Sequence, residues 1–397
     1  MDCPLNRTLL ANSDRNPWGM VKDARLRLWP AGSPFLQPGT FVYPVKQKWF
    51  VGDTQMANEP TFQTGDECTV RPSIYYHFAL DIGGAEGMTD VVAATDGLVI
   101  ARGTAAMPEY KQGTPVAPDY DKVYVLDGRG WIHAYIHLLS IDPGIRLGER
   151  IRMGQKIGIL GKEGQSAGWS HLHFAIYSHQ PSGQWGIEEG YAFLWEAYLR
   201  QYEPALIAVA RPHRLAAVGE KVVLDGSKSW SRRGKIVQYE WMFVDGSKAS
   251  GPKVERSYNA PGTYHEALKI TDDRGQVAYD FAFVQVLERP RAGGAPEDRA
   301  PPTIHAIYSP TFNLHPGQPI TFLARTFRTT AGSETWDFGD GSPEVKVKSD
   351  GGVDPHARNG YVKTVHTYRK PGDFLVRVER RNERGQRAVA RLLVQIR

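Results

Sequence analysis

Five polar side chains in the first half of the chain constrain its fold most strongly, because they form one metal site only if distant segments meet. His77 lies four residues before Asp81, His137 follows later, and His171 and His173 are two residues apart. Two imidazoles and one carboxylate are a typical ligand set for a catalytic zinc ion, which keeps its fourth position for water. The two remaining histidines can act on that water or on the developing oxyanion. The sequence therefore predicts a zinc hydrolase.

The spacings predict a different backbone shape for each segment. Residues i and i+2 of a strand point to the same face, roughly 6.6 Å apart, so His171 and His173 can share one cleft without both binding the metal. In a straight strand His77 and Asp81 would be about 13 Å apart, too far for two bonds of about 2 Å to one ion. The chain is therefore expected to bend between them.

Further motifs surround these residues in a fixed order. They are Ala93-Ala-Thr-Asp-Gly-Leu-Val99, Tyr135-Ile-His-Leu138, the glycine-containing run 147–164 and Ser170-His-Leu-His-Phe174. In this order the motifs resemble the LytM/lysostaphin-type metallopeptidases, peptidase family M23, over about residues 43–193. The resemblance implies that His77, Asp81 and His173 bind zinc and that His137 and His171 are the catalytic histidines.

Two residues near these motifs need separate interpretation. Ala79 stands where the family usually has glycine, but this change removes no ligand. His133 precedes His137 by four residues and would share its strand face, so we interpret it as a residue of the cleft wall. No His-Glu-x-x-His helix offers a glutamate base. We expect His171 to orient or deprotonate the water and His137 to stabilise the oxyanion or protonate the leaving amine, and the sequence leaves open which does which.

Length and composition indicate several β-rich domains. A chain of 397 residues is too long for one hydrophobic core. Its 41 glycines and 27 prolines indicate many turns. No apolar run reaches membrane-spanning length, and the first residues lack a signal core, so we expect a mature secreted, periplasmic or cell-envelope protein, with a cytoplasmic location left open. Cys3 and Cys68 allow one disulfide or two thiols.

The fold class expected is mainly β: an antiparallel-sheet metallopeptidase domain followed by two immunoglobulin-like β-sandwiches. Alternating apolar residues predict strands at 122–126, 131–136 and 173–177, and Asp127-Gly128 predicts a hairpin. A helix is expected over 191–202. The expected organisation is an N-terminal arm (1–42), an M23-like zinc metallopeptidase domain (43–203), a first PKD-like domain (204–288), a linker (289–302) and a second PKD-like domain (303–397).

The two sandwiches are expected because the second half of the chain contains a repeat. Segments 241–247 and 336–342 match at an offset of 95, and segments 258–264 and 368–374 match at an offset of 110. The second copy therefore carries 15 extra residues, expected around 348–360. The run Trp336-Asp-Phe-Gly-Asp-Gly341 resembles the signature of PKD domains, although the first copy has Met242 and Val244 instead of the Asp and Gly.

Basic charge is concentrated in the last domain. Residues 301–397 contain 15 Lys and Arg against 9 Asp and Glu, a net charge of +6 compared with +5 for the whole chain. Six arginines lie on or between the last two expected strands: Arg377, Arg380, Arg381, Arg384, Arg387 and Arg391. They indicate either a solvated surface or contact with an anionic cell-wall polymer. No motif supports binding to nucleic acid.

The function expected is a secreted zinc-dependent endopeptidase that hydrolyses peptide bonds, with peptidoglycan cross-bridges as the substrate that the resemblance implies. One alternative is an extracellular endopeptidase that acts on environmental or host proteins. Another is a catalytically inactive cell-wall binding protein, which the presence of both His137 and His171 disfavours. The sequence leaves open which peptide bond is cleaved, what the PKD-like domains bind and the oligomeric state.

Overall fold

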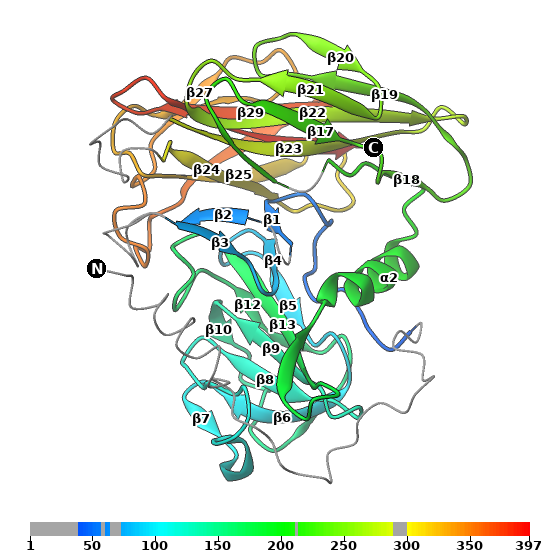
Figure 1. The fold of residues 1–397 in the computed structure, drawn as a ribbon, viewed down its shortest axis with the longest axis vertical. Helices are drawn as coiled ribbons and strands as arrows, with labels where there is room; N and C mark the ends of the chain where they lie inside the picture. Colours follow the sequence, from blue (N-terminus) through cyan, green and yellow to red (C-terminus); the bar gives the residue numbers. More distant parts are fainter. Residues whose placement is uncertain (1–38, 57–59, 64–72, 211–212, 289–299) are drawn as a thin grey trace. The chain divides into compact units, whose positions relative to one another are not determined.

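The computed structural model describes residues 39–56, 60–63, 73–210, 213–288 and 300–397, and their regular structure is almost entirely β (Figure 1). Residues 39–49, 54–56 and 76–203 of this set form one compact unit, and the rest form a second. Both cysteines, most of the expected arm and most of the expected linker lie outside the described residues. No helix among the described residues is long and apolar enough to cross a membrane.

The first unit is built on an antiparallel sheet with β13 (His171–His179) near its centre. The other strands of this sheet are β1 (Thr54–Gln55), β4 (Leu80–Gly83), β6 (Gly97–Arg102), β7 (Ala105–Ala106), β8 (Val123–Leu126), β9 (Ile132–Ile136), β11 (Arg150–Ile151) and β14 (Trp185–Glu188). Their main order is β1-β4-β13-β9-β8-β6-β11, while β14 pairs with β13 and β7 pairs with β6. The strand β13 therefore has β4 on one side and β9 on the other.

The predicted strands and hairpin of this unit are confirmed by β8, β9 and β13. Strands β8 and β9 pair antiparallel across the predicted turn. The Asp127 carboxylate shapes this turn, because its Oδ1 accepts hydrogen bonds from the backbone N–H groups of Arg129 and Trp131 at 2.8 and 3.0 Å. Buried apolar residues of the sheet, including Ile132, Ala134 and Ala175, form its core.

A second antiparallel sheet and an α-helix also belong to the described part of the first unit. Strands β5 (Asp90–Val92), β10 (Leu138–Ile141) and β12 (Lys156–Leu160) pair in the order β10-β12-β5. Helix α2 (Gly190–Tyr202) confirms the predicted helix and begins where the Glu189 carboxylate accepts the Tyr191 N–H at 3.0 Å. The smaller elements of the N-terminal half are β2 (Pro60–Gln63), β3 (Ser73–Tyr76) and the 3₁₀ helix η1 (Pro108–Tyr110).

The second unit contains the two copies of the repeat, with strands of the first copy in three sheets and strands of the second copy in two. The first copy comprises β15 (Leu206–Ile207), β16 (Arg214–Ala217), β17 (Lys221–Asp225), β18 (Trp230–Ser231), β19 (Ile236–Met242), β20 (Lys248–Ser250), β21 (Lys253–Ser257), β22 (Gly262–Asp272) and β23 (Val277–Leu287). The second copy comprises β24 (Thr303–Ser309), β25 (Pro319–Phe327), β26 (Glu334–Asp337), β27 (Val345–Val347), β28 (Val362–Thr367), β29 (Gly372–Arg381) and β30 (Arg387–Ile396). A parallel pairing of β22 with β30 joins one sheet of each copy.

The repeated aromatic motif forms the core of each sandwich, as its alternation predicts. Trp241 and Phe243 of the first copy are buried, and so are Trp336 and Phe338 of the second. An aspartate stabilises the turn after the motif. In the second copy, Asp340 Oδ1 accepts the backbone N–H of Ser342 at 3.0 Å. The extra residues of the second copy lie between β27 and β28, where they were expected.

One arginine of the basic C-terminal cluster lies in the interior rather than on the surface. Arg380 on β29 is buried, and its Nη1 donates to Oε1 of the equally buried Glu334 at 2.9 Å. The same carboxylate accepts hydrogen bonds from Thr326 Oγ1 and Ser349 Oγ, each at 2.6 Å. Interpreting the whole cluster as solvated surface is therefore wrong for Arg380, because this carboxylate and its partners compensate its charge inside the sandwich.

We predict that Arg380→Ala destabilises the last domain by about 3–5 kcal/mol, because it leaves the Glu334 carboxylate buried without its cation. Hydrogen exchange of the β29 amides, measured by mass spectrometry on the full chain, gives the change in protection. Arg384→Ala, at an exposed arginine between β29 and β30, is the matched control and should change stability by less than about 0.5 kcal/mol. Equal protection in the two variants would contradict the prediction.

Candidate metal centre

Three neighbouring strands bring the predicted site residues together. In the antiparallel register between β13 and β4, His173 lies directly opposite Asp81. In the register between β13 and β9, His173 lies opposite Ile136, so that His137 follows immediately. His171 is two residues from His173 on the same strand face. Sheet pairing alone therefore collects four of the five predicted residues.

The fifth residue, His77, reaches the site through a bend. Strand β3 ends at Tyr76 and β4 begins at Leu80, so the chain is not a straight strand between His77 and Asp81. This break confirms the predicted bend and brings His77 Nε2 to 3.1 Å from Asp81 Oδ2. On the other side of the same carboxylate, Oδ1 lies 2.8 Å from His173 Nδ1.

The five residues form two overlapping groups that could hold a metal ion. One group is His77, Asp81 and His173, and the other is His137, His171 and His173. In each group the candidate ligand atoms lie within 4.8 Å of one another, and every residue is buried. The first group offers two imidazole nitrogens and one carboxylate oxygen, which is a donor set that suits a catalytic zinc ion with an open position. The residues present therefore fit a resident metal ion.

Electrostatics in the site are dominated by one buried carboxylate among histidines. Burial by itself would raise the pKa of Asp81, but His171, His77 and His173 hold it well below its usual value. Burial lowers the pKa of His171 well below its usual value, and burial also lowers the pKa of His173. For His77, Asp81 outweighs burial and raises the pKa. Asp81 is thus ionised and offers a negatively charged ligand.

The tautomers of His137 and His171 follow from their hydrogen bonds. His137 Nδ1 lies 2.7 Å from the Glu163 carbonyl oxygen, and His171 Nδ1 lies 3.0 Å from the Trp169 carbonyl oxygen. A carbonyl oxygen only accepts, so each Nδ1 carries the proton and each neutral ring keeps its lone pair at Nε2. The two ring centroids are 4.7 Å apart. Both histidines can therefore accept a proton at Nε2.

Sequence reasoning did not find Asp121, which holds His137 in place. His137 has a φ of 71°, a left-handed conformation that is uncommon for residues other than glycine. Its backbone N–H donates to Asp121 Oδ2 at 3.0 Å, and the next N–H, of Leu138, donates to the Asp121 carbonyl at 3.1 Å. Asp121 Oδ2 is also 3.4 Å from His137 Nδ1. No motif or spacing in the sequence pointed to this long-range contact.

The environment of Asp121 supports this interpretation. The side chain is buried, and although burial would raise the pKa of Asp121, the hydrogen bond and charge of His137 hold it below its usual value. A Cβ at Gly164, whose φ is +61°, would lie 2.6 Å from Asp121 Oδ2, so the loop approaches the carboxylate closely only because this residue is glycine. The Asp121 carboxylate is therefore held between His137 and the loop at Gly164.

His133 is not a residue of the cleft wall, and that prediction is wrong. Its ring is fully buried on β9 next to the rings of Phe41 and Phe174, and Nε2 lies 2.9 Å from Asp127 Oδ2. Four residues separate His133 from His137, but the left-handed conformation of His137 ends the strand and breaks their common face. Ala79, where the family usually has glycine, is buried in the core.

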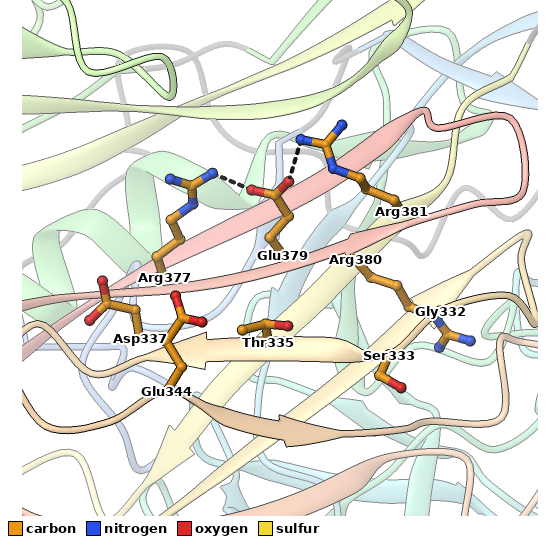
Figure 2. A pocket seen from close by; sticks show the side chains of 9 residues that line it. All are labelled: Gly332, Ser333, Thr335, Asp337, Glu344, Arg377, Glu379, Arg380 and Arg381. Carbon is orange, nitrogen blue, oxygen red and sulfur yellow. Dashed lines mark hydrogen bonds and ion pairs between the residues drawn. The ribbon is translucent and has the colours of Figure 1, made fainter.

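The basic cluster of the last domain borders a groove that is mixed in charge. The groove has a volume of about 430 Å³, and Arg377, Arg381, Asp337, Glu344 and Glu379 are among its lining residues. Figure 2 shows that the Glu379 carboxylate lies between Arg377 and Arg381 and forms ion pairs with both. These arginines are therefore compensated by carboxylates on their own surface, which disfavours a strongly cationic surface there.

Comparisons with known families assign the parts of the chain. The family model of peptidase family M23 matches residues 75–184, which include all five site residues, and PKD domain models match residues 204–286 and 305–393. The first domain of the chain therefore belongs to peptidase family M23, a family of metallopeptidases, and two PKD domains follow it.

Individual relatives cover only parts of this architecture. Collagenase ColA of Clostridium perfringens (strain 13 / Type A) is 33% identical over 81 residues, and Microbial collagenase of Vibrio alginolyticus is 29% identical over 94 residues. These matches cover 20% and 22% of this chain, but only 7% and 12% of the two collagenases. The chain thus spans about a tenth of the length of the curated relatives it matches.

Solved structures similar to the chain include one for each domain type. The catalytic domain of lysostaphin from Staphylococcus simulans is 19% identical, with 36% of this chain and 92% of that chain covered and a TM-score of 0.26. The PKD1 domain of the Vibrio cholerae metalloprotease PrtV is 26% identical, with 21% and 98% covered and a TM-score of 0.18.

We predict that Asp121→Ala lowers kcat for peptide hydrolysis roughly a hundredfold with little change in KM, because His137 loses the carboxylate that fixes its position. Asp121→Asn keeps an oxygen acceptor for the His137 N–H and should retain more of the activity. Steady-state kinetics and metal content of the purified variants test this. Asp119→Asn, in the same loop but without contact to His137, is the control. A larger effect on KM than on kcat would refute the positioning role.

Proposed function

We propose that the protein is a zinc-dependent endopeptidase whose first domain carries the active site. The observation that carries this proposal is the convergence of His77, Asp81 and His173, with His137 and His171 beside them. We assign the first three as zinc ligands because they include the ionised carboxylate. The alternative group, His137, His171 and His173, leaves this carboxylate out and offers imidazole nitrogens only.

Zinc, when bound, supplies Lewis acidity towards the substrate carbonyl and activates a water nucleophile. The chain's own residues then move the protons. In the tautomers described above, Nε2 of His137 and of His171 accepts a proton and donates one only after it has been protonated. The first step open to these histidines is thus removal of a proton from the water nucleophile, and the protonated ring can pass it to the leaving amine.

Two classes of polymer are candidate substrates. Peptidoglycan cross-bridge peptides are the substrate that the family resemblance implies, and extracellular proteins are the alternative. One observation favours the second class: large apolar side chains, among them Phe78 and Leu139, are exposed next to the site residues. The two PKD domains fit an extracellular or cell-envelope location, with a polymer contact outside the catalytic domain. The carboxylates around Glu379 make an anionic wall polymer a weaker candidate for that contact.

A digest separates these possibilities. Purified full-length protein is incubated with peptidoglycan and with soluble and insoluble proteins, and the released products are identified by mass spectrometry. New amino termini in either polymer support the endopeptidase and identify the bond cleaved. An inactive binding protein would release nothing from any of them while it still sediments with one.

We predict that His77→Ala and His173→Ala lose bound zinc, whereas His137→Ala and His171→Ala keep it and lose hydrolysis at least about a hundredfold, as expected for general acid–base groups. Metal analysis of protein purified without chelator and peptide kinetics measure the two effects separately. Full zinc retention in both ligand variants would remove the assignment of the ligands. His133→Ala is the matched control, since this histidine is buried away from the site and should affect stability more than catalysis.

A further inference from the structure

We infer that the surface beside the metal centre selects peptides with a bulky apolar side chain next to the scissile bond. This inference rests on the proposed peptidase function and narrows its substrate class. It comes from apolar residues that the catalytic assignment does not use. We call Phe78, Leu139 and Trp169 the apolar rim.

Phe78 is placed against a proposed metal ligand yet remains open to solvent. Its ring centroid lies 5.2 Å from that of His173, in an edge-to-face arrangement, and 5.9 Å from that of His77. The residue is nevertheless 44% exposed, although its neighbours His77 and Asp81 are buried. An exposed phenyl ring in contact with the ligand shell is in position to contact a substrate side chain close to the reacting carbonyl.

Trp169 and Leu139 extend the apolar rim along the proposed catalytic histidines. The Trp169 ring stacks on His171 with centroids 3.9 Å apart and is only partly buried. Leu139 follows His137 by two residues and is 43% exposed. Gly161 contacts both the backbone at Leu139 and the site. Its carbonyl oxygen accepts the His171 N–H at 3.1 Å, and a Cβ on Gly161 would lie 2.4 Å from the Leu139 backbone nitrogen.

Exposed apolar side chains are concentrated at this site. Within the described part of the first unit, the large apolar residues that are clearly exposed are Phe78, Met88, Tyr120, Leu139 and Leu147. Tyr120 joins the same region, since its hydroxyl accepts the Gly164 N–H at 2.9 Å, next to the Glu163 carbonyl that bonds His137. By contrast, Leu147 precedes β11, at the far edge of the sheet from β13. Three of these exposed side chains, Phe78, Tyr120 and Leu139, therefore lie beside the site.

The substrate class follows from what would cover this rim. Removing apolar surface from water is favourable in proportion to the area removed, and a glycyl or alanyl cross-bridge offers at most one methyl group per residue for that purpose. A leucyl or phenylalanyl side chain covers far more of the rim. The chemistry of the rim thus favours protein segments with a bulky apolar side chain next to the scissile bond.

The test uses quenched fluorescent peptides with a central Gly-Gly bond, identical except for one neighbouring residue, which is Gly, Ala, Leu or Phe. We expect kcat/KM for the Leu or Phe peptide to exceed that for the Gly peptide at least about tenfold in the wild-type protein, a typical discrimination by an apolar pocket. The double variant Phe78→Ala/Leu139→Ala should reduce this ratio to within about threefold. Leu147→Ala is the matched control and should keep the wild-type ratio. Metal content confirms that the site next to Phe78 is intact.

Equilibrium binding of the same peptides to the His137→Ala variant, measured by calorimetry, separates the proposed selectivity from the proposed peptidase function. If the wild-type protein cleaves the Gly peptide as well as the Leu and Phe peptides, the selectivity is overturned and the peptidase function stands. An unchanged ratio in the double variant also overturns the role of the rim. If no peptide is cleaved, the proposed function fails for these sequences, and binding decides the selectivity: equal affinities for all four peptides overturn it.

Discussion

Strand β13 has to pair with β4 on one side and β9 on the other in a single register, and the site depends on this constraint. The register places His173 opposite both Asp81 and Ile136. A slip of one residue would turn His171 and His173 to the other face of the sheet. The buried apolar residues on both faces of β13 oppose such a slip, because every residue from His171 to Ser178 is buried. Core packing and site geometry therefore specify the same register.

Buried aspartates next to histidines recur through the first domain with different consequences. Asp81 lies between His77 and His173, Asp121 holds His137, and Asp127 pairs with His133 inside a hairpin. Each contact joins a buried carboxylate to a histidine, but only the contacts of Asp81, and the one in which Asp121 holds His137, include residues of the groups that could hold a metal. An Asp–His contact therefore does not by itself indicate a functional site. Its place in the sheet decides its role.

The second half of the chain uses buried charge for stability rather than for chemistry. The Arg380–Glu334 pair is buried in the second PKD domain, and Glu379 is shared among arginines on the surface of the same sheet. Composition counts all of these arginines as positive charge available for binding, but ion pairing compensates several of them. The excess of basic residues in this domain is thus a weaker indication of an anionic partner than the sequence suggested.

The sequence by itself determined the class of fold, the strands and hairpin around the site, the helix over residues 190–202 and the repeat, because each depends on local periodicity, turn residues or a motif in fixed order. It also indicated which five residues converge, through the ordered motifs that resemble peptidase family M23. Only the tertiary structure decided the role of His133, the burial of Arg380, the contact of Asp121 with His137 and the exposure of Phe78. These depend on long-range strand pairing and on the left-handed conformation of one histidine, which no local pattern encodes.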